Sequence, residues 1–277
     1  MDIIMWHKVL SPYVMAVDEL ILKFDSLRRE FQEQGQYCPI EHVTGRVKSI
    51  SSILDKMAKK NIPPEKMEEQ IEDIAGIRII CQFTEDINRV ASLITSRTDI
   101  ELVEIKDYIR NQKQSGYRSY HMVVHYEVNT INRPKKILVE IQIRTMAMDF
   151  WATTEHSLQY KYKGQIPERV GSRLSNAADA IISLDSEMSS VRDEIMDAQL
   201  SSKLRYNLVE DIVNTIESLY RMTSKREVEK IQEEFYRIYQ SGDVEELVRY
   251  HHQLDLIAQA YHAQKNRVDE GIKISEE

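Results

Sequence analysis

The sequence predicts an α+β fold in which a mixed β-sheet is flanked by helices and followed by a long all-helical C-terminal extension. Strand-like runs are confined to residues 77–144, where they alternate with helical patterns. All 6 prolines lie before residue 168, so no proline interrupts a helix in the remainder of the chain. With 277 residues, 42% of them hydrophobic, the chain can bury one large core or two smaller ones.

The first half of the chain is expected to begin with a helical arm, residues 3–33, in which apolar residues recur at helical spacing. Four runs rich in β-branched and aromatic residues follow and are predicted as strands. The segments around them carry helical patterns. The predicted strands are 77–83, 101–106, 119–127 and 135–144, and the predicted helices are 47–60, 64–72 and 85–96.

After residue 145 the pattern is helical throughout. Ser224 and Glu227 form a predicted capping box at the start of one of these helices. Apolar stripes along the last three helices are typical of a core or a subunit contact rather than a ligand site. The predicted helices are 146–162, 168–200, 207–221, 225–240 and 243–264, and the predicted domains are 1–200 and 201–277.

Charge and cysteine content narrow the class of protein. The net charge of -8 disfavours general electrostatic binding to nucleic acid. Cys38 and Cys81 match neither a metal-ligand spacing nor a disulfide framework, so both are expected to be reduced thiols. The first residues do not resemble a signal peptide, and no run approaches the about 18 apolar residues of a membrane span. We therefore expect a soluble cytoplasmic protein without a membrane partner.

The stretch V-E-I-Q-I-R-T, residues 139–145, alternates strictly between apolar and polar residues. Val139, Ile141 and Ile143 would point to one face of a strand, and Glu140 and its polar neighbours to the other. A solvated edge strand has this pattern, and so has a strand whose polar face lines a cleft. The sequence pattern alone leaves both interpretations open.

Cations gather in two places although the chain is acidic. Lys48, Ser52, Lys56 and Lys59 recur at helical spacing and form a stripe with few acids along a predicted helix. The segment K-D-Y-I-R-N-Q-K-Q-S-G-Y-R-S-Y-H, residues 106–121, combines cations and tyrosines around a Ser-Gly turn. Basic groups bind phosphate oxygens and aromatic faces stack bases, so both segments suit a nucleotide. Surface stripes and loops of this composition are also common without any ligand.

Two carboxylates accompany these cations. In E-D-I-A-G-I-R, residues 72–78, Asp73 comes directly before a strand, and Glu140 lies on another strand. Such a pair can hold Mg²⁺ against nucleotide phosphates, whereas a lone Asp before a strand is more often a cap or turn residue. Together, the carboxylates, the cations and the aromatic loop are what phosphoryl transfer between nucleotides requires.

Four segments together resemble the small alarmone synthetases, the synthetase-only members of the RelA/SpoT superfamily, which are also called GTP pyrophosphokinases. They are TGRVKSISSILDK (44–56), EDIAGIRI (72–79), KDYIRNQKQSGYRSYH (106–121) and VEIQIRTMAMDFWATTEHSLQYKYK (139–163). The resemblance covers about residues 1–200 and implies a nucleotidyltransferase-like synthetase core. It also implies Mg²⁺-dependent transfer of the pyrophosphoryl group of ATP to the ribose 3′-hydroxyl of GDP or GTP, giving AMP and guanosine tetra- or pentaphosphate, the signals of the stringent response.

Carried onto the matching positions, the resemblance implies three groups of site residues. Asp73 and Glu140 would be the metal ligands and catalytic carboxylates, with Glu140 either completing the metal site or acting as general base. The ATP-binding residues would be Arg46 and Arg78, which clasp the adenine, and Lys48, Ser52, Lys56 and Lys59, which hold the phosphates. The GDP- or GTP-binding residues would be Tyr117, stacked on the guanine, with Lys106, Lys113, His121 and Arg144, and Gln142 and Glu155 as weaker candidates. The resemblance thus implies that the polar face of residues 139–145 lies in the cleft.

The resemblance also bears on assembly and regulation. It implies a homo-oligomer, a tetramer in relatives. Relatives with an allosteric alarmone site carry a lysine, an aromatic residue and an asparagine where this chain has Asp25, His42 and Asp149. We therefore expect little or no activation by the product, although Glu41 and Thr44 fit the relatives' pattern. Larger relatives add a hydrolase domain with a His-Asp motif, and this chain contains no such dipeptide. Synthesis without hydrolysis is therefore expected.

Two other functions stay open at this point. A nucleotidyltransferase that releases pyrophosphate would also use paired carboxylates on a mixed sheet. A catalytically idle regulator would use Tyr117 and the basic stripe to bind a nucleotide or single-stranded RNA. Release of AMP distinguishes pyrophosphoryl transfer from both. The role of the C-terminal helices is not predicted by any motif.

Overall fold

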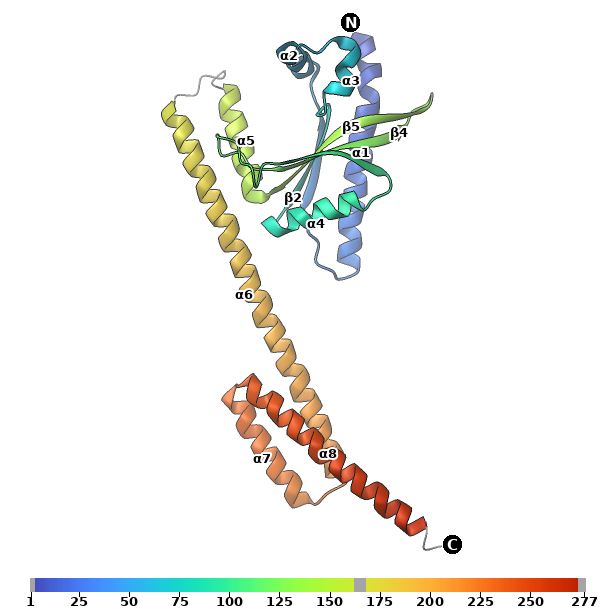
Figure 1. Cartoon of the computed structure of the whole chain (residues 1–277), viewed down its shortest axis with the longest axis vertical. Coiled ribbons are helices and arrows are strands. Elements are labelled where there is room, and N and C mark those ends of the chain that lie inside the picture. Colours follow the sequence, from blue (N-terminus) through green and yellow to red (C-terminus); the bar gives the residue numbers. More distant parts are fainter. Residues whose placement is uncertain (1–2, 162–167, 274–277) are drawn as a thin grey trace. The chain divides into compact units, whose positions relative to one another are not determined.

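The structure, a computed structural model, describes residues 3–161 and 168–273. Its contacts divide the chain into two compact units, Met1–Ser190 and Val191–Glu277. The boundary predicted after residue 200 lies within the same helix, α6. The first unit contains α1 (Ile3–Glu33), β1 (His42–Val47), α2 (Ile50–Lys60), a 3-10 turn η1 (Pro64–Lys66), α3 (Met67–Gln70), β2 (Ala75–Cys81), α4 (Thr84–Thr95), β3 (Ile100–Asp107), β4 (Tyr120–Asn129), β5 (Pro134–Thr145), α5 (Met146–Lys161) and the first part of α6 (Glu168–Tyr220) (Figure 1). The second contains the rest of α6, α7 (Lys225–Ser241) and α8 (Val244–Lys273).

The first unit is built on a five-stranded sheet in the order β1-β2-β5-β4-β3. The inner strands β2 and β5 are parallel, and the other neighbouring pairs are antiparallel. The four strands predicted from sequence correspond to β2, β3, β4 and β5. The α+β class with a mixed sheet is therefore confirmed.

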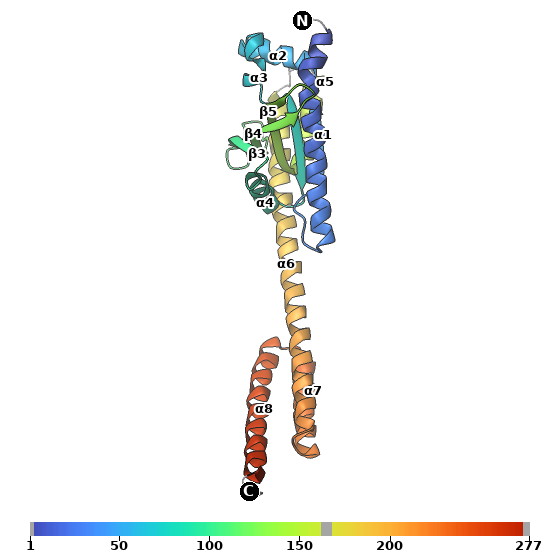
Figure 2. The same ribbon diagram turned by 90° about the vertical axis from the view of Figure 1, so that its right-hand side faces the viewer.

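One face of the sheet is the core of the first unit. On β5, Val139, Ile141 and Ile143 are fully buried, as their alternation with polar residues predicts. Each buried side chain of this kind contributes roughly 1.5–3 kcal/mol to folding. Residues of α1 and α4 belong to the same apolar cluster. Figure 1 shows α1 and α5 on opposite sides of the strands, and Figure 2 shows the strands as a layer beside α1.

Strand β1 was not expected from the sequence, because the predicted helix 47–60 begins next to it and Gly45 weakens its strand pattern. The glycine has a packing role. A Cβ at this position would lie 2.7 Å from Val17 Cγ1 on α1 and 2.9 Å from Ile77 Cδ1 on β2. Only a residue without a side chain lets α1 pack this closely on β1. The sheet is thereby extended by one strand, which carries residues of the site described below.

Several helix bounds also differ from the predicted ones. Helix α2 begins at Ile50, since Ser49 is its N-cap and accepts a hydrogen bond from the Ser52 N–H at 3.3 Å. The predicted helix 64–72 is a short 3-10 turn followed by α3. The predicted helices 168–200 and 207–221 are one continuous helix, α6, because the intervening S-S-K-L-R-Y contains no glycine or proline. The end of the predicted helix 146–162 lies outside the described residues.

The second unit has a core of its own. The apolar stripes of its three helices meet one another, as predicted for core positions, and the fully buried members include Ile212, Leu219 and Leu247. The capping box is confirmed, since Ser224 caps α7 and accepts a hydrogen bond from the Glu227 N–H at 3.4 Å. Among the described residues, no helix combines the length and hydropathy that a membrane span requires.

Candidate active site

The polar face of the sheet lines a cleft of about 470 Å³. Directly paired residues share a face of a sheet, so the strand register decides which side chains enter the cleft. α5 and the loop before β4 complete its wall. Three paired rows lie on this face: Arg46–Gly76–Glu140, Thr44–Arg78–Gln142–His121 and His42–Ile80–Arg144. Because β5 is an inner strand, the solvated-edge interpretation of V-E-I-Q-I-R-T is excluded, and its polar face looks into the cleft.

Asp73 lies at the floor of the cleft, just before β2, and both of its oxygens accept hydrogen bonds from lysines. Lys48 Nζ donates to Oδ2 and Lys56 Nζ donates to Oδ1, each at 2.8 Å. The Lys48 N–H also donates to the Ile74 carbonyl at 2.8 Å, which keeps Lys48 beside the carboxylate. Burial raises the pKa of Asp73, but the two lysines outweigh this effect, and its net pKa is below the ordinary value.

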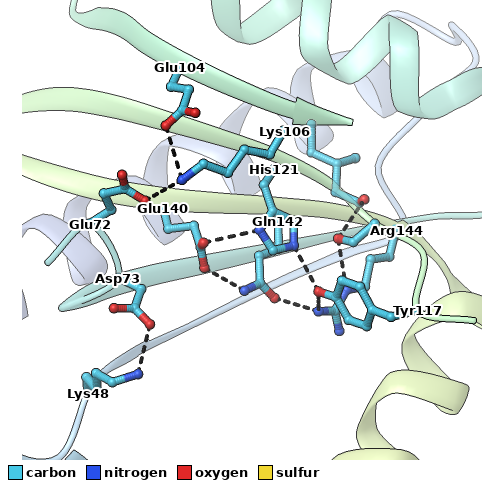
Figure 3. A network of polar contacts seen from close by, with 12 residues as sticks. Lys48, Glu72, Asp73, Glu104, Lys106, Tyr117, His121, Glu140, Gln142 and Arg144 are labelled. Atoms are coloured by element: carbon cyan, nitrogen blue, oxygen red, sulfur yellow. Dashed lines mark hydrogen bonds and ion pairs between the residues drawn. The ribbon is translucent and has the colours of Figure 1, made fainter. Parts of the chain in front are cut away.

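Glu140 is the second carboxylate of the cleft (Figure 3). His121 Nδ1 lies 3.1 Å from Oε1, and Gln142 Nε2 donates to Oε2 at 2.7 Å. Burial raises the pKa of Glu140, and the charge of Asp73 raises it as well. The interaction with His121 and the hydrogen bond from Gln142 together outweigh both, so the net pKa is lowered and the carboxylate is ionised.

The two carboxylates fit a magnesium ion held jointly with a nucleotide. Both line the same cleft, and Asp73 is close enough to Glu140 for its charge to raise the pKa of Glu140. In residues 3–161 and 168–273 no three His, Cys, Asp or Glu side chains gather into a complete metal site. Mg²⁺ is usually held by one or two carboxylates, with waters and substrate phosphates as the other ligands. The donor set of Asp73 and Glu140 is of this kind.

Two arginines of the cleft share one carboxylate. Asp149, in the first turn of α5, lies 3.0 Å from Arg144 Nη1 and 3.2 Å from Arg78 Nη1. Arg144 is 4% exposed, whereas Arg78 presents a larger part of its side chain to the cleft. The shared carboxylate therefore fixes both guanidinium groups.

The loop before β4 brings an aromatic cluster to the cleft. The Tyr117 ring packs edge-on against Tyr108 and His121, with ring centroids 5.9 and 6.0 Å apart, and Lys113 Nζ lies 5.0 Å from its centroid. Burial raises the pKa of Tyr117 even though nearby groups, among them the Arg144 guanidinium, oppose the shift. Gly116, in the left-handed region at φ +85°, allows the loop to pack directly on α6.

The structure brings most of the predicted site residues together, in two shells. Those lining the cleft are Arg46, Asp73, Arg78, Tyr117, Glu140, Gln142, Arg144 and Glu155. Those bonded to a lining residue, or lying over its ring, are Lys48, Lys56, Lys113 and His121. The roles that the resemblance implies for these residues stay predictions.

Three further predicted residues do not line the cleft. Ser52 Oγ accepts a hydrogen bond from Ser49 Oγ at 2.8 Å on α2, and Lys59 is exposed near the end of that helix. Lys106 shares the face of the sheet with His121 but its Nζ pairs with Glu72 at 2.6 Å (Figure 3). None of the three is among the residues that line the cleft.

The polar lining residues on α5 that were not predicted as site residues are Thr153 and His156. They belong to the T-T-E-H segment, in which only Glu155 was singled out. A usable signal was present, since residues 152, 153, 155 and 156 all lie on the helix face that includes Glu155. The sequence marks Asp149 only as a departure from relatives, because its two arginine partners come from different elements of the chain.

Known proteins are similar to this chain over about 70% of its length. Residues 45–165 match the family model described as the region found in RelA / SpoT proteins. Over 199 residues the chain is 50% identical to the GTP pyrophosphokinase YjbM of Bacillus subtilis, covering 72% of this chain and 94% of YjbM. It is 40% identical to the GTP pyrophosphokinase YwaC of the same organism, covering 69% of this chain and 91% of YwaC.

A solved structure is similar as well. The small alarmone synthetase 1 of Bacillus subtilis, in a crystal structure with its product pppGpp, superimposes with a TM-score of 0.67 at 50% identity. The match covers 69% of this chain and 98% of that one. The fold, the cleft and these similarities lead to one assignment: the chain belongs to the RelA/SpoT family, among the small alarmone synthetases that are named GTP pyrophosphokinases.

Proposed function

We propose that this chain is an ATP:GTP/GDP 3′-pyrophosphotransferase, which makes AMP and guanosine penta- or tetraphosphate and does not hydrolyse its product. The main observation behind this proposal is that Asp73 and Glu140 line the same cleft as two arginines, Arg46 and Arg78, and an aromatic residue, Tyr117. Such a cleft can hold two nucleotides with their reacting groups at the carboxylates. The similar synthetase that binds pppGpp as its product supports the same reaction.

On the ATP side, Arg46 and Arg78 lie in neighbouring rows of the sheet and would clasp the adenine between guanidinium planes. Lys48 and Lys56, extended by Ser52 and Lys59 along α2, would hold the phosphates. In the substrate-free protein the first two lysines neutralise Asp73. Phosphate oxygens offer them other acceptors, so substrate binding would make the Asp73 oxygens available to a cation.

When bound between Asp73 and Glu140, Mg²⁺ would offset the charge of the transferring phosphates. The lysines that flank Asp73 act in the same electrostatic sense, because they bring positive charge to the side of the cleft where ATP phosphates are expected. The protein residues thus position the donor and stabilise charge, which is most of what phosphoryl transfer needs from an enzyme.

On the acceptor side, Tyr117 would stack on the guanine, and Lys113, His121 and Lys106 would serve its phosphates or ribose, with Gln142 and Glu155 nearby. Glu140, which its neighbours keep ionised, would take the proton of the ribose 3′-hydroxyl. The hydroxyl oxygen forms a bond to the β-phosphorus of ATP. The bond from that phosphorus to the oxygen bridging the α-phosphate breaks, and AMP leaves.

Assembly and location stay predictions. A homo-oligomer, a tetramer in relatives, is the expected state, and single-stranded RNA remains a candidate partner. A cytoplasmic location is supported by Cys38 and Cys81, which are both free thiols.

A chromatographic assay tests the proposed reaction. Purified protein is incubated with ATP, Mg²⁺ and either GDP or GTP, and all nucleotides are quantified. We expect AMP to appear in equal amount to a new guanosine tetra- or pentaphosphate, and the rate to fall roughly 100-fold or more in Glu140→Gln. Glu127→Gln, the same change at an exposed position on β4, is the matched control and should retain the wild-type rate.

The other outcomes are equally informative. Pyrophosphate release with a nucleotide-linked product would identify a nucleotidyltransferase instead. Tight nucleotide or RNA binding without turnover of either acceptor would identify a regulator on a synthetase fold. Manganese-dependent release of pyrophosphate from added tetraphosphate would contradict synthesis without hydrolysis.

A further inference from the structure

Arg144 is at the centre of the hydrogen-bond network that surrounds Glu140 (Figure 3). It is 4% exposed, and its donors are directed at protein groups. Nη1 donates to Asp149 Oδ1 at 3.0 Å and Nε donates to Ser119 Oγ at 3.1 Å. The remaining nitrogen, Nη2, donates to Tyr117 Oη at 2.6 Å and to Gln142 Oε1 at 2.8 Å. A guanidinium whose donors are engaged in this way is poorly placed to bind a phosphate.

The bond to Gln142 fixes which way its amide points. A guanidinium can only donate, so the Gln142 atom that faces Arg144 must be the oxygen. The amide nitrogen is then turned toward Glu140, where it donates to Oε2 at 2.7 Å. Arg144 thereby determines the partner of one Glu140 oxygen without touching it.

The bond to Tyr117 has a similar consequence on the other side. The Tyr117 oxygen accepts from Arg144, and its single proton can be donated to His121 Nε2, 2.8 Å away. A neutral His121 that accepts at Nε2 carries its proton on Nδ1, which lies 3.1 Å from Glu140 Oε1. The hydrogen bonds then run in one direction, from Arg144 through Tyr117 and His121 to Glu140.

We propose that Arg144 is a positioning residue that, through Gln142 on one side and Tyr117 with His121 on the other, orients both carboxylate oxygens of Glu140 for its role in the transfer. This inference rests on the proposed function only for the consequence of that orientation, because the hydrogen-bond directions exist without substrate. Asp149 anchors Arg144 from behind through Nη1. One buried cation thus sets the direction of two hydrogen-bond paths to Glu140, one through Gln142 and the other through Tyr117 and His121.

The hydrogen-bond direction from Tyr117 through His121 to Glu140 is tested first, on protein without added substrate. Histidine ring nitrogens are labelled with ¹⁵N and observed by NMR in mildly alkaline buffer, and the His121 signals are assigned by their loss in His121→Gln. We expect the proton on Nδ1 in the wild type and a mixture of tautomers in Arg144→Lys, which keeps the charge opposite Asp149 but cannot reach every acceptor. A wild-type proton on Nε2 would overturn the inference, whatever the enzyme's activity.

Kinetics test the consequence for catalysis. In Arg144→Lys and in Tyr117→Phe, which keeps the aromatic ring, kcat should fall about 10-fold or more, as is typical when an orienting partner is lost, with little change in KM. Tyr108→Phe is the matched control, since no hydrogen bond of its hydroxyl is found within the described part of the chain and its ring contacts survive. If both residues act along one hydrogen-bond path, adding Tyr117→Phe to Arg144→Lys should lower kcat by less than about a further twofold.

The result that overturns the inference differs from the one that overturns the proposed function. An active wild type in which Arg144→Lys raises KM for the guanosine nucleotide and leaves kcat intact would make Arg144 a direct nucleotide ligand. Additive losses in the Arg144→Lys/Tyr117→Phe double variant would place the two residues on separate routes. A wild type without pyrophosphoryl transfer would refute the proposed function, and the NMR result would still decide the hydrogen-bond direction.

Discussion

Replacement of Gly45 with alanine tests the close contact between α1 and β1. The added Cβ would lie 2.7 Å from Val17 Cγ1, 2.9 Å from Ile77 Cδ1 and 3.0 Å from Ile21 Cδ1. The two isoleucine atoms are the ends of flexible side chains, whereas Val17 is β-branched and stiff. Overpacking costs about 1–3 kcal/mol, and alanine recovers about 0.4–1 kcal/mol by restricting the unfolded chain. We expect a net loss of about 1–2 kcal/mol in the free energy of unfolding.

Urea unfolding followed by tryptophan fluorescence measures this loss. Both tryptophans, Trp6 and Trp151, are buried in the first unit, so their signal reports on that unit and not on the C-terminal helices. Val17→Ala removes the stiff neighbour and serves as the second arm of a double-mutant cycle. The double variant should be about 1 kcal/mol more stable than the sum of the two single effects predicts. Strict additivity within about 0.3 kcal/mol would refute the steric account.

Three further predictions follow from individual positions. Gly116→Ala should lower the free energy of unfolding by about 2–3 kcal/mol, because φ is +85° and the new Cβ would lie 2.5 Å from a Cβ on α6. Gly35→Ala, with φ +62° and open space around it, should lower it only by the left-handed strain of about 1–2 kcal/mol. Equal losses for the two variants in urea unfolding would contradict this prediction. Asp99→Asn should cost about 0.5–1 kcal/mol at neutral pH. Hydrogen bonds from an arginine in the same turn and a lysine on α1 lower the Asp99 pKa to about 2, so the stabilisation is present above the ordinary carboxyl pKa and the two unfolding curves should converge as pH falls toward 2. Added guanosine pentaphosphate should change the initial rate of synthesis little, because Asp25 and Asp149 are anionic and Asp149 is already paired with two arginines; several-fold activation would show the expectation to be wrong.

Much of the fold could be predicted from the sequence because its periodic signals are local. The alternation in 139–145 predicted a strand with one buried and one polar face, and that strand is β5. The absence of proline after residue 167 predicted a helical C-terminal part, and α6, α7 and α8 occupy it. Two predictions failed: β1 was not predicted as a strand, and α6 was predicted as two helices although the residues between them include no glycine or proline.

The candidate site also contains residues that the sequence could identify and partners that it could not. Asp73, Glu140 and Tyr117 could be named from the sequence, since carboxylate, aromatic and basic residues in ordered motifs are typical of a nucleotide-binding enzyme. Their partners could not. The pairing of Lys48 and Lys56 with Asp73 depends on how α2 docks beside β2, and the sharing of Asp149 by two arginines depends on where α5 begins relative to the sheet.

By itself, the sequence determined the α+β class and the helical C-terminal extension, because these follow from residue type and local spacing. It also carried the family resemblance, which implied the predicted residues of the cleft. Only the tertiary structure decided that β5 is an inner strand, between β2 and β4, and that Arg144 is buried with its donors committed to neighbouring side chains. The physical reason is that hydrogen-bond direction, burial and strand register depend on groups far apart in the chain, which come together only when the sheet and its helices pack.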